Sequence, residues 1–168
     1  KGGVGFAKAA GNYAASFFPT KQANARGFQQ VIWTDSSDHK YIEECGTMNI
    51  WFRIGDRLIT PELSDSILGG ITRDSIITLA MDFAIEVEER KVLVSEILHA
   101  FKNGELLEVF GTGTAVSVSA ISSITYRDHR MCIPIVVDSF SSKLKLKLRS
   151  IQKGEIKDPY NWISKILS

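Results

Sequence analysis

Four short segments, far apart along the 168-residue chain, contain the residue types that can do chemistry together. They offer a lysine, a glutamate, a tyrosine and two glycine-rich stretches that contain threonine. A lysine amine can bond covalently to an aldehyde, and free backbone N–H groups near glycines can hold an anion. In chain order the segments are Lys8-Ala9-Ala10-Gly11-Asn12-Tyr13, Glu44-Cys45-Gly46-Thr47-Met48-Asn49, Leu68-Gly69-Gly70-Ile71-Thr72-Arg73-Asp74 and Phe110-Gly111-Thr112-Gly113-Thr114-Ala115.

The third segment stands where a helix is expected to begin. Apolar residues recur at helical spacing from Thr72 to Phe83, and Asp74 favours the positive first turn of such a helix. The first N–H groups of a helix have no partner within it and can bind a phosphate. The residues alone therefore predict an anion site at Gly70, Ile71 and Thr72.

The glycine-rich start of the chain fits neither of the common nucleotide-binding loops. A Walker A loop ends in Gly-Lys-Ser/Thr, whereas Lys8 stands between Ala7 and Ala9. A dinucleotide-binding fingerprint needs a third glycine at the position of Lys8 and a strand before it. Both interpretations are therefore excluded, and the run from Gly111 to Thr114 is by itself typical of a tight loop.

The first part of the chain predicts one helix and then an antiparallel meander. Residues 12–26 are rich in Ala, Gln and Lys, and Gly27 is well placed to end this helix. A proline inside a helix removes a hydrogen bond, so we expect a kink or a break at Pro19. β-Branched and aromatic residues between turn residues then predict strands over 30–34, 41–44, 48–54 and 58–60.

Helices and strands alternate in the rest of the chain, which predicts an α/β fold of mixed α+β type. The helix from Thr72 is followed by a strand over 85–90 and by a helix over 95–102, with Ser95 as its N-cap. The remaining elements are strands at 109–110 and within 115–126, and a helix over 139–153.

The run of residues 143–148 alternates lysine with leucine and imitates a strand. Leu144, Leu148 and Ile151 also lie at helical spacing, and the segment continues without a turn signal. We therefore expect a helix here, with the lysines on a solvated face.

Composition gives no reason to expect nucleic acid or membrane as a partner. The net charge is +1, and no long apolar or charged run occurs. Cys45 and Cys132 lack metal-ligand neighbours, and the three histidines are scattered, so no metal site is predicted. So few cysteines favour a reducing compartment, and we expect a cytoplasmic protein.

The four segments, in this order and at these separations, resemble the branched-chain amino-acid aminotransferases, which are class IV, fold type IV pyridoxal-phosphate enzymes. The resemblance runs from Gly3 to Ile166 and includes Val87-Glu88-Glu89-Arg90 and Ile151-Gln152-Lys153-Gly154. It implies the cofactor pyridoxal 5′-phosphate, with Lys8 as the catalytic Schiff-base lysine that also moves the substrate's α-proton.

The resemblance also assigns the other cofactor contacts. Glu44 would face the pyridine nitrogen, while its neighbour Glu43 would be a surface residue. Tyr13 would bind the phenolic oxygen of the cofactor, and Leu68 would pack on one face of its ring.

Two further sets of contacts follow from the same resemblance. The N–H groups of Ile71 and Thr72 and the hydroxyl of Thr114 would hold the phosphate, and the N–H groups of Thr114 and Ala115 would bind the substrate carboxylate. Val116 and Ser119 occupy the positions of a Cys-x-x-Cys redox pair in vertebrate members, so no such switch is expected.

The family's chains are roughly twice as long. The resemblance therefore implies that residues 1–168 form the C-terminal cofactor-binding domain, a pseudo-barrel of mixed strands with outer helices, and that an N-terminal domain is absent. The whole enzyme would be a homodimer, and this part alone would be inactive.

The expected reaction is transamination of leucine, isoleucine and valine with 2-oxoglutarate, in branched-chain amino-acid biosynthesis. Two alternatives stay open at this point. One is another class IV activity, such as D-amino-acid transaminase or aminodeoxychorismate lyase. The other is a non-catalytic domain of the same fold.

Overall fold

The computed structural model describes residues 2–164, which form four helices and ten strands. The helices are α1 (Ala10–Ala25), α2 (Ile71–Asp82), α3 (Val94–Lys102) and α4 (Phe140–Gln152). The strands are β1 (Ile32–Thr34), β2 (Tyr41–Cys45), β3 (Met48–Ile54), β4 (Arg57–Pro61), β5 (Glu86–Arg90), β6 (Val92–Leu93), β7 (Leu106–Gly113), β8 (Ser117–Ala120), β9 (Ser123–Tyr126) and β10 (His129–Cys132).

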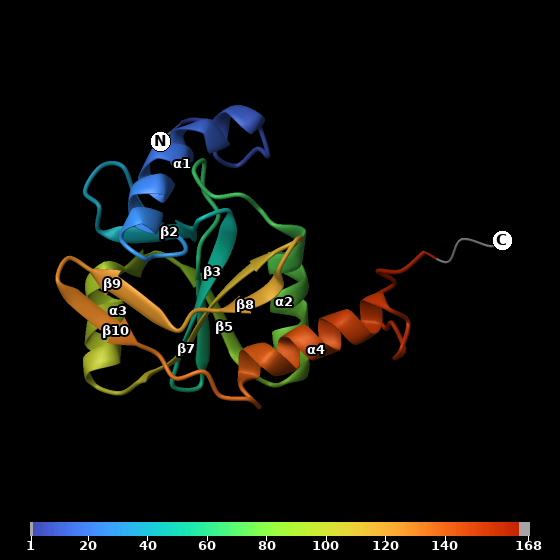
Figure 1. The fold of residues 1–168 in the computed structure, drawn as a ribbon. Coiled ribbons are helices and arrows are strands. Elements are labelled where there is room, and N and C mark those ends of the chain that lie inside the picture. The colour runs from blue at the N-terminus through green and yellow to red at the C-terminus, as the bar shows by residue number, and fades with distance from the viewer. Residues whose placement is uncertain (1, 165–168) are drawn as a thin grey trace.

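Strand β3 is the centre of an eight-stranded mixed sheet (Figure 1). It pairs antiparallel with β7 along one edge and with β2 and then β4 along the other. Strand β5 adds to β4 in parallel, β8 adds to β7, and β1 and β6 both pair with β2. These pairings leave the sheet of the described residues open, so the expected pseudo-barrel is not seen as a closed ring.

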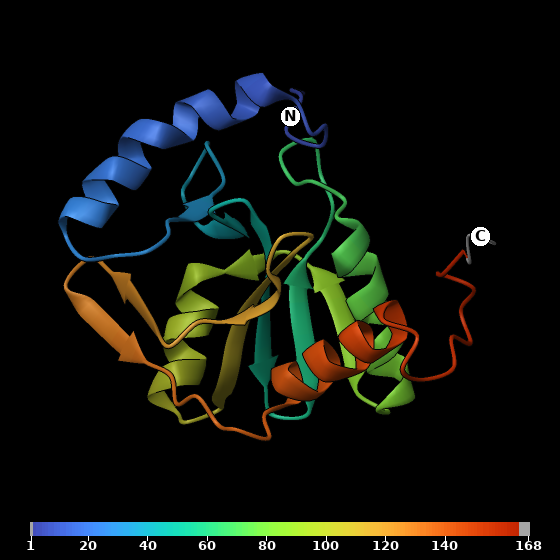
Figure 2. The same cartoon turned by 45° about the vertical axis from the view of Figure 1, so that its right-hand side comes forward.

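The sheet separates two hydrophobic cores, because side chains alternate between its faces. Ile50 and Phe52 of β3 belong to a core with α3, while Trp51 between them packs in a second core with α2 and α4. Figure 2 shows α2 and α4 on one side of the sheet and α3 with the β9–β10 hairpin on the other. The mixed α/β class expected from the sequence is therefore confirmed.

The meander predicted from the sequence is confirmed, since β1 to β4 pair antiparallel in chain order. Strand β3 has the expected bounds, Met48–Ile54. The helix expected over 139–153 is α4, in which Leu144, Leu148 and Ile151 are buried and the Ser139 side chain accepts a hydrogen bond from the Ser142 N–H.

Of the kink or break expected at Pro19, the break does not occur, because α1 continues from Ala10 to Ala25 with Pro19 inside it. None of its residues is buried, and Figure 2 shows the helix curving along the outside of the molecule. A helix that is not packed into a core can bend around the proline ring without ending.

The expected N-cap at Ser95 is also wrong. Helix α3 begins at Val94, and the N-cap position is held by Leu93, which makes no side-chain cap hydrogen bond. The Val94 N–H donates to the Lys40 carbonyl at 2.8 Å, directly after β6 pairs with β2. Strand pairing therefore sets the start of this helix in place of a capping side chain.

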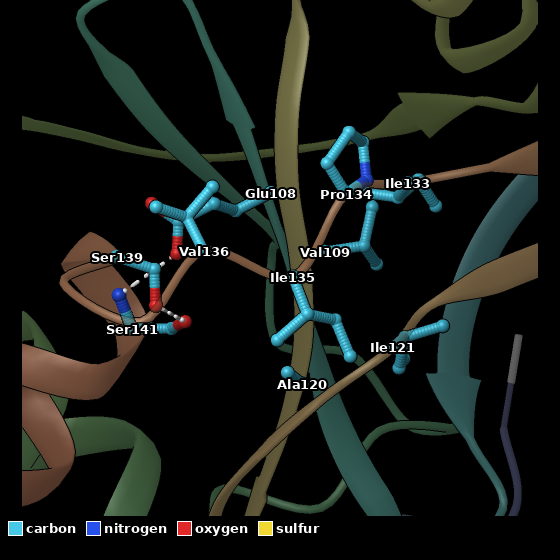
Figure 3. Close-up of a pocket in the computed structure, with 10 residues that line it drawn as sticks. All are labelled: Glu108, Val109, Ala120, Ile121, Ile133, Pro134, Ile135, Val136, Ser139 and Ser141. Atoms are coloured by element: carbon cyan, nitrogen blue, oxygen red, sulfur yellow. Dashed lines mark hydrogen bonds between the residues drawn. The ribbon is translucent and has the colours of Figure 1, made fainter.

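Glu108 of β7 joins the sheet to the start of α4. Its carboxylate accepts hydrogen bonds from the N–H groups of Phe140 and Ser141 at 2.8 and 2.9 Å, and it pairs with Arg53 at 2.9 Å. Figure 3 shows the Glu108 side chain beside Ser141, which lies in the first turn of α4. Burial opposes the charge of Glu108, but the hydrogen bonds from Ser141, Arg53 and Phe140 outweigh burial and lower the pKa of this carboxyl.

We predict that Glu108→Ala lowers the free energy of unfolding by about 2–3 kcal/mol, since it leaves two helix N–H groups and one guanidinium without their partner. Glu105→Ala, at an exposed position just before β7, is the control and should change it by less than about 0.5 kcal/mol. Urea unfolding of both variants measures the difference. Equal losses would contradict the role given to Glu108.

Candidate functional site

The ends of four elements meet at one end of the sheet. Glu44 pairs with Asn49, and Asn49 pairs with Thr112, so the end of β2, the start of β3 and the end of β7 lie side by side. The start of α2 joins them, because a Cβ atom at Gly70 would meet the Asn49 side chain. Three of the four segments singled out in the sequence are thus brought together.

The remaining segment, which contains Lys8, is fixed to this end through the loop before α2. The Gly2 N–H donates to the Asp65 carboxylate at 2.8 Å and the Phe6 N–H to the Asp65 carbonyl at 3.1 Å. A Cβ atom at Gly5 would lie 2.6 Å from the Ser66 Cα, so this close approach of two backbones requires glycine.

Lys8 follows this anchored loop and is exposed. Its Nζ lies 5.9 Å from the centre of the Tyr13 ring, and its charge is close enough to act on the Glu44 carboxyl. The amine therefore lies beside the phenol ring, and it acts on the carboxyl through its charge.

Glu44 is a half-buried carboxyl with few compensating contacts. Its Oε1 accepts from the Leu68 N–H at 3.0 Å and lies 3.5 Å from the Asn49 amide nitrogen, whereas no hydrogen bond among the described residues reaches Oε2. Burial raises the pKa of Glu44 to about 7, against the opposing effects of the Leu68 N–H and the Lys8 charge, and Glu43 adds to the rise. Such a carboxyl would be stabilised by a cationic or N–H partner at Oε2.

The neighbouring Glu43 has a different environment. It is half-buried and accepts a hydrogen bond from the Ser66 hydroxyl at 2.6 Å. Successive side chains of a strand point to opposite faces, which separates the two carboxylates.

The start of α2 has the free donors that its sequence predicted. Gly70 is the N-cap and makes no side-chain cap, while the first bond of the turn runs from the Asp74 N–H to the Gly70 carbonyl. Within residues 2–164, the N–H groups of Ile71 and Thr72 donate to no protein acceptor. The Ile71 side chain is 84% exposed, so this helix end is open to an anion.

Thr114 and Ala115 lie in the exposed turn that joins β7 to β8. At Gly113, where β7 ends, an added Cβ would be 3.9 Å from the Thr47 carbonyl oxygen of the β2–β3 turn. The turn is therefore at the same end of the sheet as Glu44, as the sequence expects.

Asn49 is a site residue to which the sequence gave no role. It is buried and donates from Nδ2 to the Leu68 carbonyl at 2.8 Å. The signal in the sequence is weak: Asn49 is a polar residue in the otherwise mainly apolar strand Met48–Ile54.

Two hollows in the surface lie elsewhere. Figure 3 shows a small cavity beside Glu108 and Ile135, of about 10 Å³, which has room for about one water molecule. An open groove of about 460 Å³ lies beside Arg53, Phe83 and Lys143. Neither is lined by a residue of the four segments, so these two hollows are not part of the candidate site.

Within residues 2–164, no group of three or more His, Cys, Asp and Glu side chains could hold a metal ion. No helix in the same part of the chain is long and apolar enough to cross a membrane. Cys45 and Cys132 are both free thiols.

The chain belongs to the class IV aminotransferases, since a sequence model of the family described as "Amino-transferase class IV" matches residues 7–124. Among curated proteins, the chain is 46% identical over 166 residues to a probable branched-chain-amino-acid aminotransferase of Staphylococcus epidermidis. It is 42% identical over 167 residues to branched-chain-amino-acid aminotransferase 2 of Bacillus subtilis. The matches cover 96% and 99% of this chain but 46% of each relative, so the chain spans about half their length.

Solved structures show the same fold. The branched-chain amino acid aminotransferase from Escherichia coli superposes with a TM-score of 0.80 at 28% identity, over 96% of this chain and 51% of that one. The branched-chain amino acid aminotransferase from Thermobaculum terrenum, in its PLP-form, gives a TM-score of 0.73 at 26% identity, over 91% of this chain and 47% of that one.

The raised pKa of Glu44 predicts a dependence of stability on pH in the cofactor-free protein. Because its folded-state pKa of about 7 exceeds the usual 4.5, the folded protein keeps a proton that the unfolded chain loses. The stability that this group contributes is complete below about pH 4.5 and is lost as the pH rises through about 7. Unfolding free energies from urea titrations should therefore fall across this window, and Glu44→Gln should flatten the fall.

Glu86→Gln, at an exposed carboxyl far along the sheet, is the matched control and should leave the slope unchanged. A slope that persists in Glu44→Gln would show that another group is responsible.

Proposed function

We propose that residues 1–168 are the C-terminal, cofactor-binding half of a branched-chain amino-acid transaminase that uses pyridoxal 5′-phosphate. The reaction moves the amino group of leucine, isoleucine or valine to 2-oxoglutarate. The observation that carries the proposal is that the half-buried Glu44 carboxyl binds the Leu68 N–H just before the unpaired N–H groups that begin α2, within range of the charge on Lys8.

The residues present fit the proposed cofactor at two points. The unpaired N–H groups of Ile71 and Thr72 suit a phosphate at a helix start, and the Thr114 hydroxyl would add a further donor. The free Oε2 of Glu44 suits the N–H of a pyridinium ring, because an opposite charge there would relieve the cost of burying the carboxyl.

Lys8, Tyr13 and Leu68 would complete the hold on the cofactor. Lys8 would be the point of covalent attachment to its aldehyde, Tyr13 would donate to its phenolic oxygen, and Leu68 would contact one ring face. The Leu68 N–H binds the Glu44 carboxyl, so Leu68 would contact the ring and also orient the carboxyl that faces the ring nitrogen.

When bound, pyridoxal phosphate supplies an electron sink for the charge that develops at the substrate's α-carbon. The Lys8 amine would remove the α-proton and return it, and its exposed position would leave it free to move between attachment and proton transfer. Glu44 would hold a proton on the ring nitrogen. The N–H groups of Thr114 and Ala115 would orient the substrate by its carboxylate.

The choice of substrate rests on the relatives, which are named as branched-chain aminotransferases at 46% and 42% identity. This supports branched-chain substrates over a D-amino-acid transaminase or an aminodeoxychorismate lyase. The presence of Lys8, Tyr13, Glu44 and Thr114 together supports a catalytic domain over a non-catalytic one.

The chain spans about half the length of its relatives, which supports a second, N-terminal domain that covers the cofactor in the whole enzyme. We further propose a cytoplasmic homodimer, a pseudo-barrel completed in the whole enzyme, and no activity for residues 1–168 alone. Each follows from membership of the family and from the half-length match to its members.

The test is an assay of the full-length protein that contains this chain. With added cofactor, leucine, isoleucine and valine should each yield glutamate from 2-oxoglutarate, and Lys8→Ala should reduce glutamate formation to background. Lys21→Ala, at an exposed lysine of the helix α1 that follows Lys8, is the matched control and should keep the activity. Turnover of D-alanine or aminodeoxychorismate without turnover of leucine would contradict the proposed substrate class.

A further inference from the structure

Asn49 is a buried polar residue at the centre of the candidate site. It is 6% exposed and lies between its register partners Glu44 on β2 and Thr112 on β7. Buried amides need hydrogen-bond partners, and those of Asn49 are the Leu68 carbonyl in the loop before α2 and the Glu44 carboxylate on β2. The residue therefore touches the strand that bears Glu44 and the segment that leads into the helix.

The Asn49 amide nitrogen makes two contacts. It donates to the Leu68 carbonyl at 2.8 Å and lies 3.5 Å from Glu44 Oε1. The Leu68 N–H donates to the same Glu44 oxygen at 3.0 Å. The Asn49 side chain thus contacts both the Glu44 carboxyl and Leu68, whose N–H orients that carboxyl.

The Asn49 amide oxygen meets the start of α2. A Cβ atom added to Gly70 would overlap Oδ1, closer than any ordinary contact. Gly70 has φ −70° and ψ 135°, a conformation open to any residue, so glycine is needed here for space and not for backbone freedom. At the adjacent Gly69, an added Cβ would meet only Leu63 Cδ1, at an ordinary 3.5 Å.

We propose that Asn49 is a positioning residue that sets the Glu44 carboxyl relative to the N-terminus of α2. This inference rests on the proposed function, in which Glu44 faces the ring nitrogen and the helix start holds the phosphate. The ring nitrogen and the phosphate belong to one small, stiff cofactor. Glu44 and the start of α2, which would bind them, must therefore be held at a matching separation. The amide of Asn49 touches both partners.

The first test is Asn49→Leu in the full-length protein without cofactor, with the Glu44 carboxyl titrated by carbon-13 NMR. Leucine has the same number of side-chain heavy atoms and the same branching but donates no hydrogen bond. Lys8 and Glu43, the charged groups that act on Glu44, remain in place. Loss of the donor should raise the titration midpoint by about one pH unit and weaken pyridoxal-phosphate binding by about tenfold.

A pair of glycine variants tests the contact between Asn49 and the start of α2. Gly70→Ala should push the Asn49 amide aside, and so raise the Glu44 midpoint although Gly70 makes no hydrogen bond to Glu44. Gly69→Ala is the matched control and should leave the midpoint unchanged. If Asn49→Leu does not fold, this pair decides the question.

Thr112→Val provides a control for burial alone. Thr112 is also buried and accepts a hydrogen bond from Trp51 Nε1 at 2.9 Å. Its loss should lower stability without moving the Glu44 midpoint. A positioning role predicts that only the variants that disturb the Asn49 amide change the midpoint.

The outcomes separate this inference from the proposed function. An unchanged midpoint in Asn49→Leu, or equal midpoints in Gly70→Ala and Gly69→Ala, would overturn the positioning role even if the wild type binds pyridoxal phosphate. A wild-type protein that binds no pyridoxal phosphate would contradict the proposed function. Asn49 would then have no cofactor for which to position Glu44.

Discussion

The partial burial of the Glu44 carboxyl is the constraint on which the site depends. Burial raises its pKa to about 7, and the described chain supplies the Leu68 N–H and the Asn49 amide, both at the same oxygen. A carboxyl held this way has an oxygen left for an N–H or a cation. The Lys8 amine, whose charge acts on Glu44, and the unpaired N–H groups at the start of α2 are the other groups that we propose for the same ligand.

The fold can hold these groups because the two cores fix the sheet from both faces. Trp51 packs against α2 and α4 and donates to Thr112, while Ile50 beside it packs in the core with α3. Strand β3 is thereby immobilised at the end where Asn49 meets Gly70. The helix α1, with no buried residue, covers no core and is joined to the site through the loop that precedes it.

Local patterns predicted much of this arrangement, and tertiary contacts decided the rest. The start of α2 could be predicted because its donors and Asp74 lie within one turn, and α4 because Leu144, Leu148 and Ile151 share a face. The start of α3 could not, since pairing of β6 with β2 sets it. The space between Gly70 and Asn49 joins residues far apart in the chain, so no local pattern could reveal it.

The role proposed for Glu44 is tested by comparing Glu44→Gln with Glu43→Gln in steady-state transamination by the full-length enzyme. If Glu44 Oε2 faces the ring nitrogen, Glu44→Gln should keep the cofactor but lower turnover by roughly two to three orders of magnitude. Glu43→Gln, at the carboxylate that binds the Ser66 hydroxyl, should be nearly silent. Equal losses of turnover in the two variants, or normal turnover in Glu44→Gln, would contradict the claim that Glu44 faces the ring nitrogen.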